Sequence, residues 1–341
     1  MIHEDEMDAE DPPTTTNPVE DFRDSDLARW EIFTLAAILL AILLENSLVL
    51  LALYLRGRRK LSRIQFFILH LSIADLLTGL LNVLPQLAWD ITFRFQGGDL
   101  LCRLVKFGQP FGLYLSSYVL TATAIDRYRA ICKPLDSLDH RICLLQSRNM
   151  IRCSWCLALL FSLPQVFVFS YKEISPGVWD CWATFELSYG ERAYVTWYCL
   201  AVFLLPLCVL VYTYSGICRV VRRRSEVGVA TSKSPRGDIR APATISRAKI
   251  RTAWQTIVVV ALYIASSTPF IGCELWATWD PGASSSAFLN GPAFTILALL
   301  SSLNGCVNPW VHLGFDPELR EVILRHLQAP TRSKQEADRK P

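Results

Sequence analysis

Long apolar stretches recur seven times along this chain, separated by short segments rich in charged, glycine and proline residues. A membrane-spanning helix needs roughly 20 mostly apolar residues, because in hydrocarbon the backbone must satisfy its own polar groups. The pattern therefore predicts an all-α membrane protein, a seven-transmembrane helix bundle. The expected spans are Ile32–Leu55, Phe66–Asp90, Leu101–Ile131, Met150–Ser170, Ala193–Val220, Thr252–Thr278 and Phe288–Phe315.

Basic residues predict how the chain sits in the membrane, since Lys and Arg collect on the cytoplasmic side. The clusters are Arg56, Arg58, Arg59, Lys60 and Arg63, then Arg141, Arg148 and Arg152, then Arg222, Arg223 and Arg224. The first residues are instead acidic, and they lack the basic and apolar regions of a signal peptide. The formal net charge of +3 hides this asymmetry. We expect a multi-pass plasma-membrane protein with an extracellular amino terminus and a cytoplasmic tail.

The chain divides into three expected regions. Residues 1–30 hold two adjacent prolines and a run of threonines, which predict a disordered extracellular segment. Residues 31–315 form the membrane domain, in which 225–243 is a flexible, basic inner loop near anionic lipid or an acidic partner. Residues 316–341 hold a short amphipathic helix on the inner leaflet, then a short tail. Its apolar residues are Leu319, Val322, Ile323 and Leu327. The sequence has no nucleic-acid signature.

Most of the eleven cysteines lie in apolar spans or on the cytoplasmic side, where they act as small hydrophobic residues. Two differ, because Cys102 at the outer end of the third span and Cys181 in the loop after the fourth both face the oxidising compartment. We expect a disulfide that pins this loop over the bundle. The alternative is two unpaired thiols.

Asp75 lies in the middle of the second span, where a carboxylate costs roughly 2.5–3.5 kcal/mol on insertion scales. It should therefore face the bundle and hold a partner. Ser116, Asn304 and Asn308 supply candidate oxygens from the third and seventh spans. Two readings stay open, a small-cation site with sodium as the favoured ion, or a purely structural hydrogen-bonded network.

Asp126 and Arg127 end the third span on the cytoplasmic side and precede Tyr128. An ion pair between these neighbours would restrain Arg127 until another group competes for it. A three-residue motif is weak evidence by itself.

Six polar residues fall on shared helix faces near the outer ends of the spans: Asn82, Gln86, Lys106, Gln109, Gln165 and Glu274. Amide side chains both donate and accept hydrogen bonds, which suits a peptide ligand with an exposed backbone. The pattern predicts a polar cleft. The alternative is that each glutamine only bridges neighbouring helices. Nearby aromatic residues would cap the cleft or belong to an interfacial belt; they are Trp89, Phe93, Trp179, Trp182 and Trp276.

Landmarks along the chain resemble those of rhodopsin-like G-protein-coupled receptors in order and spacing. They are Asn46, Leu71–Asp75, Cys102, Asp126-Arg127-Tyr128, Trp155, Pro206 with Tyr214, Pro269 and Asn308-Pro309. Longer strings are similar to the vasopressin/oxytocin receptor family: Leu84–Phe95, Asp99–Lys106, Asp180–Ala183, Ala248–Thr252, Ser302–Asn304 and Asn308–Trp310. The resemblance covers essentially the whole membrane domain and implies a receptor, not an enzyme.

The resemblance also implies a site for cyclic, disulfide-closed, amidated peptide hormones. Gln86, Lys106, Gln109 and Gln165 match hormone-contacting positions, and Arg23 and Glu31 match outer residues that support hormone binding. Glu31 and Asp90 match the carboxylates that hold a magnesium ion beside the hormone in oxytocin receptors. Two hard oxygen ligands with waters and peptide carbonyls suit that ion, and no cofactor is otherwise required.

Five positions depart from the family pattern. Asn82 and Glu274 stand where the family has Gln, so the cleft gains room and an extra potential negative charge. The motif Cys-Trp-x-Pro of the sixth span reads Ser266-Ser267-Thr268-Pro269, which removes the aromatic side chain that shifts during activation. His312 replaces the Tyr that swings inward in the active state.

Two hypotheses from different classes stay open. In the first, hormone binding biases a two-state bundle, the sixth span moves outward, and a G-protein α subunit engages Arg127 and Tyr214. The signal then runs through phospholipase C and calcium or through adenylate cyclase and cAMP. In the second, motivated by Ser267 and His312, the chain binds or sequesters hormone but signals poorly. The residues expected to switch are Asp126, Arg127, Tyr128, Tyr214, Ser267, Pro269, Asn308, Pro309 and His312.

Arrestin is a further expected partner, although the tail carries only Thr331 and Ser333 as hydroxyl side chains. A transporter or an enzyme has little support. The sequence shows no paired broken half-helices and no convincing nucleophile and base.

Overall fold

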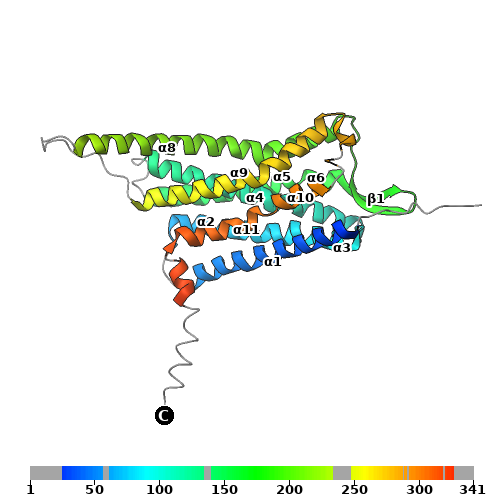
Figure 1. The fold of residues 1–341 in the computed structure, drawn as a ribbon, viewed down its shortest axis with the longest axis horizontal. Coiled ribbons are helices and arrows are strands. Elements are labelled where there is room, and N and C mark those ends of the chain that lie inside the picture. Colours follow the sequence, from blue (N-terminus) through cyan, green and yellow to red (C-terminus); the bar gives the residue numbers. More distant parts are fainter. Residues whose placement is uncertain are drawn as a thin grey trace, which may run out of the picture.

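The computed structural model describes residues 25–56, 61–133, 140–232, 247–286, 288–289, 292–317 and 319–325. The helices within these ranges run along one common direction and form a bundle (Figure 1). They are α1 (Ser25–Leu55), α2 (Arg63–Thr78), α3 (Leu84–Thr92), α4 (Gly98–Cys132), α5 (His140–Ser162), α6 (Pro164–Val168), α7 (Gly190–Cys199), α8 (Leu205–Ser232), α9 (Arg247–Trp279), α10 (Pro292–Ser301) and α11 (Asn304–Phe315). A two-stranded antiparallel hairpin, β1 (Phe169–Ser175) and β2 (Val178–Ala183), projects from one end, which we call the hairpin end. The opposite end is the Arg127 end.

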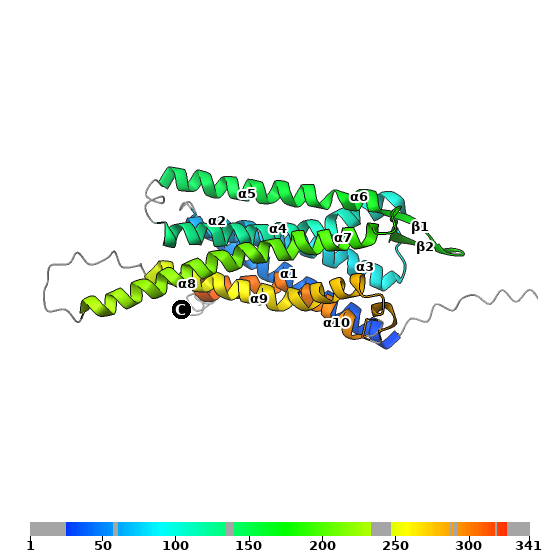
Figure 2. The ribbon, with the colours of Figure 1, turned by 90° about the horizontal axis from the view of Figure 1, so that it is seen from above.

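Helix α4 lies in the middle of the bundle and packs against α2, α5, α8 and α9 (Figure 2). Its buried positions include Tyr114, Ser116, Ser117 and Tyr118, so polar groups of α4 face protein. Within the described residues, five helical segments are long and apolar enough to cross a membrane by length and composition. Helix α4 is not among them because of this polar content. The seventh expected span is divided into α10 and α11 by a turn at Ser302 and Leu303.

Two helical spans contain one turn of π-helix, which the sequence reasoning did not anticipate. Gly79–Val83 joins α2 to α3, and Leu200–Leu204 joins α7 to α8. Each turn comes immediately before a Leu-Pro dipeptide, Leu84-Pro85 and Leu205-Pro206. Because proline has no N–H and its ring clashes with the carbonyl four residues earlier, a wider turn relieves the helix at these points.

The carbonyls released at the second π turn are satisfied by neighbouring helices. The Val202 carbonyl accepts hydrogen bonds from Ser117 Oγ at 2.9 Å and Tyr263 Oη at 2.8 Å, and the Ala201 carbonyl accepts one from Tyr118 Oη at 2.9 Å. A carbonyl without a donor costs several kcal/mol in a bilayer. These three hydroxyls therefore tie the fifth span to α4 and α9.

Several boundaries differ from the sequence expectation. Helix α1 begins at Ser25, so residues 25–30 are helical rather than part of a disordered segment. Helix α8 continues to Ser232, past the expected start of the inner loop at 225, because Ser225–Ser232 contains no proline and the helix tolerates its one glycine, Gly228. Most of that loop, like residues 1–24 and the tail after 325, lies outside the described residues.

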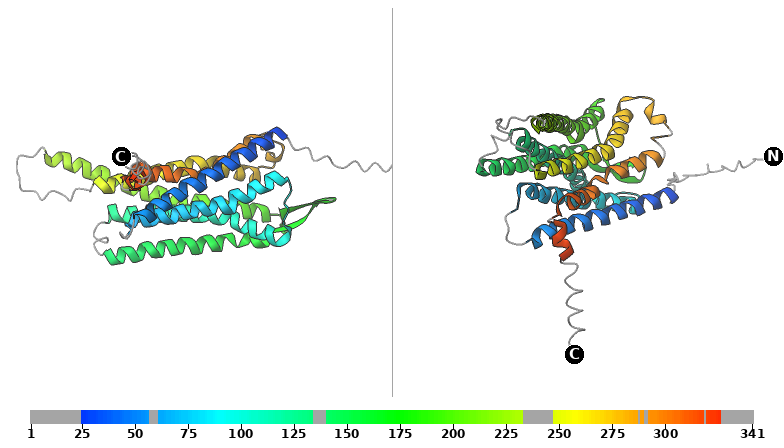
Figure 3. Two further views of the ribbon diagram at one scale, coloured as in Figure 1. Left: turned by 90° about the horizontal axis from the view of Figure 1, so that it is seen from below. Right: turned by 60° about the vertical axis from the view of Figure 1, so that its left-hand side comes forward.

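A helical segment at 319–325 follows α11 and leaves the bundle direction (Figure 3). Asp316 caps it by accepting a hydrogen bond from the Leu319 N–H at 3.3 Å. Leu319 is fully buried against Val49, Leu53 and Ile68, and Ile323 packs beside it. The predicted apolar side is thus partly buried against α1 and α2. Leu327 lies outside the described residues, and contact with the inner leaflet stays a prediction.

A close crossing of α2 and α4 at Gly112 gives a test of the packing. A Cβ at this position would lie 2.7 Å from both Cα and N of Thr78, and backbone atoms cannot yield cheaply. We expect Gly112→Ala to destabilise the bundle by about 1–3 kcal/mol, measured as a lower melting temperature of the purified protein. Gly272→Ala is the matched control, since a Cβ added there would have no neighbouring atom within 4 Å. Equal melting of the two variants would contradict the crossing.

Candidate functional site

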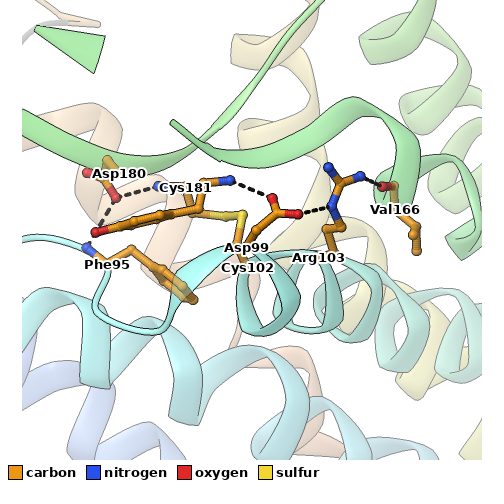
Figure 4. The surroundings of a disulfide bond; sticks show 8 residues. Phe95, Asp99, Cys102, Arg103, Val166, Asp180 and Cys181 are labelled. Carbon is orange, nitrogen blue, oxygen red and sulfur yellow. Dashed lines mark hydrogen bonds and ion pairs between the residues drawn. A yellow bond between two sulfur atoms is a disulfide. The ribbon is translucent and has the colours of Figure 1, made fainter. Parts of the chain in front are cut away.

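The disulfide between Cys102 and Cys181 is present, which confirms the expected pairing (Figure 4). It joins the first turns of α4 to β2, with a Cα–Cα distance of 5.6 Å, and both cysteines are fully buried. The hairpin is therefore fixed to the central helix of the bundle at the hairpin end.

Two carboxylates reinforce this attachment, and sequence reasoning missed both. Asp180 accepts hydrogen bonds from the backbone N–H of Phe95 at 3.1 Å and of Cys181 at 2.8 Å, and it forms an ion pair with Arg94 at 3.4 Å. Asp99 accepts from Arg103 Nε at 2.7 Å and from the Tyr171 N–H at 3.0 Å. Both residues stand in strings that resemble the receptor family, but the resemblance did not predict their contacts.

Asp99 lies in the first turn of α4, before the apolar part of the third span, and its ionised form is stabilised there. The Arg103 guanidinium and then the Tyr171 N–H hold the pKa of its carboxyl below the usual range. Arg103 also donates to the Val166 carbonyl in α6 at 2.6 Å. The same short segment of α4 thus holds β1, β2 and α6 in place over the bundle.

Beneath the hairpin, four of the predicted polar residues form one row across α3 and α4. Gln109 Nε2 donates to Gln86 Oε1 at 3.4 Å, and Gln86 Nε2 donates to Asp90 Oδ1 at 3.0 Å. The Lys106 ammonium stands over the rings of Trp89 at 4.4 Å and Phe169 at 5.0 Å. The Gln109–Gln86 bond bridges α4 and α3, as the alternative expectation had it, and Gln86 continues the row to Asp90.

The remaining predicted site residues lie on other elements of the hairpin end. Gln165 of α6 is buried beside the hydroxyl of Tyr194 in α7. Glu274 of α9 faces Tyr198 and Cys199 of α7. Asn82 lies half-buried in the first π turn, and Glu31 lies half-buried on α1, which packs against α3. Arg23 is outside the described residues. Trp179, Trp182 and Trp276 are exposed at the same end.

The predicted partners of Asp75 are largely confirmed. Ser116 Oγ donates to its Oδ1 and Asn308 Nδ2 donates to its Oδ2, both at 2.8 Å, and the carboxyl is buried between α2, α4 and α11. Asn304 instead lines a nearby cavity with Ser267, the residue that stands where the family resemblance expects Trp. The other cavity walls are apolar and aromatic: Leu113, Tyr198, Val202, Phe203, Tyr263, Phe270 and Ile271.

The ion pair between Asp126 and Arg127 is confirmed at the Arg127 end. Asp126 also forms an ion pair with Arg63 of α2 at 3.1 Å and accepts a hydrogen bond from Ser147 of α5 at 3.2 Å. One buried carboxylate therefore binds groups from three helices. The Tyr214 hydroxyl faces Arg127 and Thr256, yet within the described part of the chain it forms no well-aligned hydrogen bond.

A buried contact joins α9 to α11 and was not predicted from the sequence. It involves His312, the residue that stands where the family resemblance expects Tyr. Gln255 Nε2 and His312 Nδ1 are 2.8 Å apart, and both side chains are buried. The amide N–H donates, so Nε2 of the ring carries the proton, and among the described residues this Nε2 has no partner. The contact is named the Gln255–His312 bond below.

Comparison with known proteins agrees with this geometry. A family model described as "7 transmembrane receptor (rhodopsin family)" matches residues 45–312, which is most of the chain. The chain therefore belongs to the rhodopsin family of seven-transmembrane receptors, which are multi-pass membrane proteins and not enzymes.

Curated relatives narrow this class. The chain is 43% identical over 329 residues to the vasopressin V1b receptor of Homo sapiens, covering 89% of this chain and 77% of the relative. It is 40% identical over 324 residues to the isotocin receptor of Catostomus commersonii and to the vasopressin V2 receptor of Sus scrofa. These alignments cover 92% of this chain, and 80% and 86% of the relatives. Within the rhodopsin family, the chain belongs with the vasopressin and isotocin receptors.

If the Gln255–His312 bond forms, substitutions of its two residues should have non-additive effects on stability. Gln255→Leu leaves a buried ring nitrogen unpaired, at a cost of about 1–3 kcal/mol, whereas Gln255→Leu with His312→Phe removes both polar partners and is nearly neutral. We expect the hydrogen–deuterium exchange rate of residues 251–258 to rise several-fold in the single variant and to return to the wild-type rate in the double variant. Gln146→Leu, at an exposed glutamine of α5, is the control. Additive effects would rule out a direct coupling.

Proposed function

We propose that this chain is a receptor for a cyclic peptide hormone of the vasopressin and oxytocin type and transmits its binding to heterotrimeric G proteins. The observation that carries the proposal is the row of Gln109, Gln86 and Lys106 beneath a hairpin fixed by the Cys102–Cys181 disulfide. The residues of this row match hormone-contacting positions of the family, and the named relatives are vasopressin and isotocin receptors.

The chemistry of the row suits a peptide backbone. Each glutamine amide offers donors and an acceptor, and the present Gln109–Gln86 bond of 3.4 Å is long, so a hormone carbonyl or N–H replaces it at low cost. Lys106 stands over aromatic rings and has no short ion pair among the described residues. Its ammonium is thus suited to donate a hydrogen bond to a peptide carbonyl. Glu274 of α9 adds a potential negative charge, which would favour a hormone with a basic residue.

We infer that the hairpin end is extracellular and that the protein resides in the plasma membrane. The basic clusters predicted to be cytoplasmic, including Arg63, Arg148 and Arg222, lie at the Arg127 end, and the disulfide lies at the other end. In this orientation the amino terminus is extracellular, and Asp126, Arg127 and Tyr214 face the cytoplasm.

Transmission follows from the contacts at the Arg127 end. Asp126 holds Arg127, and the Gln255–His312 bond holds α9 to α11. Hormone binding favours an arrangement in which the inner part of α9 moves outward and Arg127 with Tyr214 meets the G-protein α subunit. Tyr128, Pro269 and Asn308-Pro309 lie on the helices that rearrange. Arrestin is a further proposed partner of the same open end.

The proposal is tested in cells that express the full chain. Inositol phosphate, calcium and cAMP are measured during titration with vasopressin-like and oxytocin-like peptides, beside radioligand binding on the same cells. We expect saturable binding and a second-messenger response. Gln109→Leu should weaken binding by roughly tenfold, because it removes about 1–1.5 kcal/mol of hydrogen bonding, while Gln146→Leu leaves it unchanged.

The separate readouts distinguish the two hypotheses. Saturable binding with silence in every channel would mean that Ser267 and His312 impair switching, and the chain would then be a sequestering protein. Absence of binding to every peptide of this type would overturn the proposal.

We further infer that a magnesium ion supports hormone binding at Glu31 and Asp90. The donor set fits a hard cation, since both side chains are carboxylates on the adjoining helices α1 and α3, and peptide carbonyls and waters complete such sites. At Asp75, whose two oxygens already accept from Ser116 and Asn308, sodium binding remains an alternative to a structural network.

Hormone affinity should therefore depend on magnesium. We expect chelation to lower affinity several-fold, repletion to restore it, and Glu31→Gln or Asp90→Asn to abolish this dependence, because each removes a charged oxygen ligand. Asp90→Asn keeps an acceptor for Gln86, and Asp280→Asn, in the loop after α9, is the control. Binding that is indifferent to chelation would remove magnesium from the site.

A further inference from the structure

The Gln255–His312 bond borders a small cavity between α2, α4, α9 and α11, with a volume of about 20 Å³. One water molecule needs roughly 10–15 Å³, so the cavity has room for one. Apart from Gln255 and His312, its polar described walls are the hydroxyl residues Thr123 of α4 and Thr256 of α9, and the rest of the described lining is apolar. The His312 ring is therefore surrounded by protein with almost no room for solvent.

These surroundings suit a neutral imidazole. In that form one ring nitrogen accepts and the other donates, and Nδ1 accepts from Gln255 Nε2 at 2.8 Å. A protonated ring donates from both nitrogens. The Gln255 amide could turn its oxygen toward Nδ1, but the positive charge would still lie among apolar walls with room for one water. Burying a charge without a paired anion is costly, so the present arrangement favours the neutral ring.

The titratable and charged groups on the surrounding helices form no hydrogen bond or ion pair with the His312 ring, within the described part of the chain. On α4, Asp126 holds Arg127, and it also holds Arg63 of α2. The others are His70 and Asp75 of α2, Asp316 at the end of α11, Arg251 of α9, Tyr214 of α8, and Glu45 and Arg56 of α1. An imidazolium at this position would thus lack an anionic partner.

We propose that His312 makes the opening of the Arg127 end sensitive to protons, because a protonated ring favours the arrangement in which α9 has moved away from α11. The inference rests on the outward motion of α9 in the proposed function, but it does not depend on hormone binding.

The direction of the effect follows from proton linkage. An imidazole in water titrates near pH 6.5, so the ring can charge once α9 leaves and solvent reaches it. The closed arrangement holds the neutral ring, and opening therefore takes up a proton. Acid should favour opening, and the ratio of open to closed molecules should rise roughly fourfold between about pH 7.5 and about pH 6.0.

The test measures a distance across the Arg127 end by double electron–electron resonance on the full receptor in nanodiscs, without hormone. Spin labels are attached through non-canonical amino acids at two exposed positions, Arg251 of α9 and Arg148 of α5, since exposed native thiols such as Cys153 would react with thiol labels. We expect the longer-distance fraction to rise roughly fourfold relative to the shorter one on acidification.

Variants assign this rise to one ring. His312→Tyr and His312→Phe should both abolish it, because neither side chain takes up a proton between about pH 7.5 and about pH 6.0. His70→Gln is the matched control, at a half-buried histidine of α2 that accepts a hydrogen bond from Trp155, and it should keep the rise. Glutamine retains an acceptor for Trp155 at this position.

Other outcomes overturn the inference. These are a wild-type distance distribution that is the same at both pH values, an equal rise in wild type and both His312 variants, or a rise that only His70→Gln abolishes. Hormone binding and second messengers are measured separately on the same variants. Acid-driven opening in a chain that does not respond to hormone would support this inference while the proposed function fails. A hormone response without acid-driven opening would keep the proposed function and remove His312 as the proton site.

Discussion

Backbone polar groups inside hydrocarbon must form hydrogen bonds. In this bundle the clearest effect of this constraint is at Pro206. Proline cannot donate to the helix ladder, the preceding turn widens, and the carbonyls of Ala201 and Val202 turn to the hydroxyls of Tyr118, Ser117 and Tyr263. A local defect of one span thus becomes a set of contacts among three helices. Motion of α9 relative to the fifth span must keep or replace the Tyr263 bond, which limits the paths such motion can take.

Helix α4 contributes at least one side chain to each of the regions described above. Cys102 and Arg103 hold the hairpin, Lys106 and Gln109 belong to the polar row, Ser116 binds Asp75, and Asp126 binds Arg127. Its central place explains why its sequence is less apolar than that of its neighbours. Polar groups that would be costly against lipid are satisfied here by other helices.

The sequence predicted residues whose chemistry is conspicuous in an apolar setting, and the structure confirms the disulfide, the Asp126–Arg127 pair and the bonds from Ser116 and Asn308 to Asp75. It did not predict contacts that depend on helices meeting in space. The Gln255–His312 bond joins residues 57 positions apart, and the Asp180 bond to Phe95 spans 85 positions. Periodicity places a residue on a helix face, but only packing selects its partner. The π turns were missed because prolines within spans do not reveal how the preceding turn adjusts.

The surroundings of Ser267 and His312 suggest what these two differences from the family pattern do. His312 is held by Gln255 in a bond that ties α9 to α11, while Ser267 borders a cavity where the family resemblance expects an aromatic ring. In the proposed switching, the first contact would favour the arrangement in which α9 stays against α11, and the cavity beside Ser267 would leave less packing to resist a rearrangement. A ligand shifts such an equilibrium only by its differential affinity for the two arrangements. If hormone binding drives the proposed switching, the hormone must gain more from the row of Gln86, Lys106 and Gln109 in the rearranged bundle than the Gln255–His312 bond contributes to the present one.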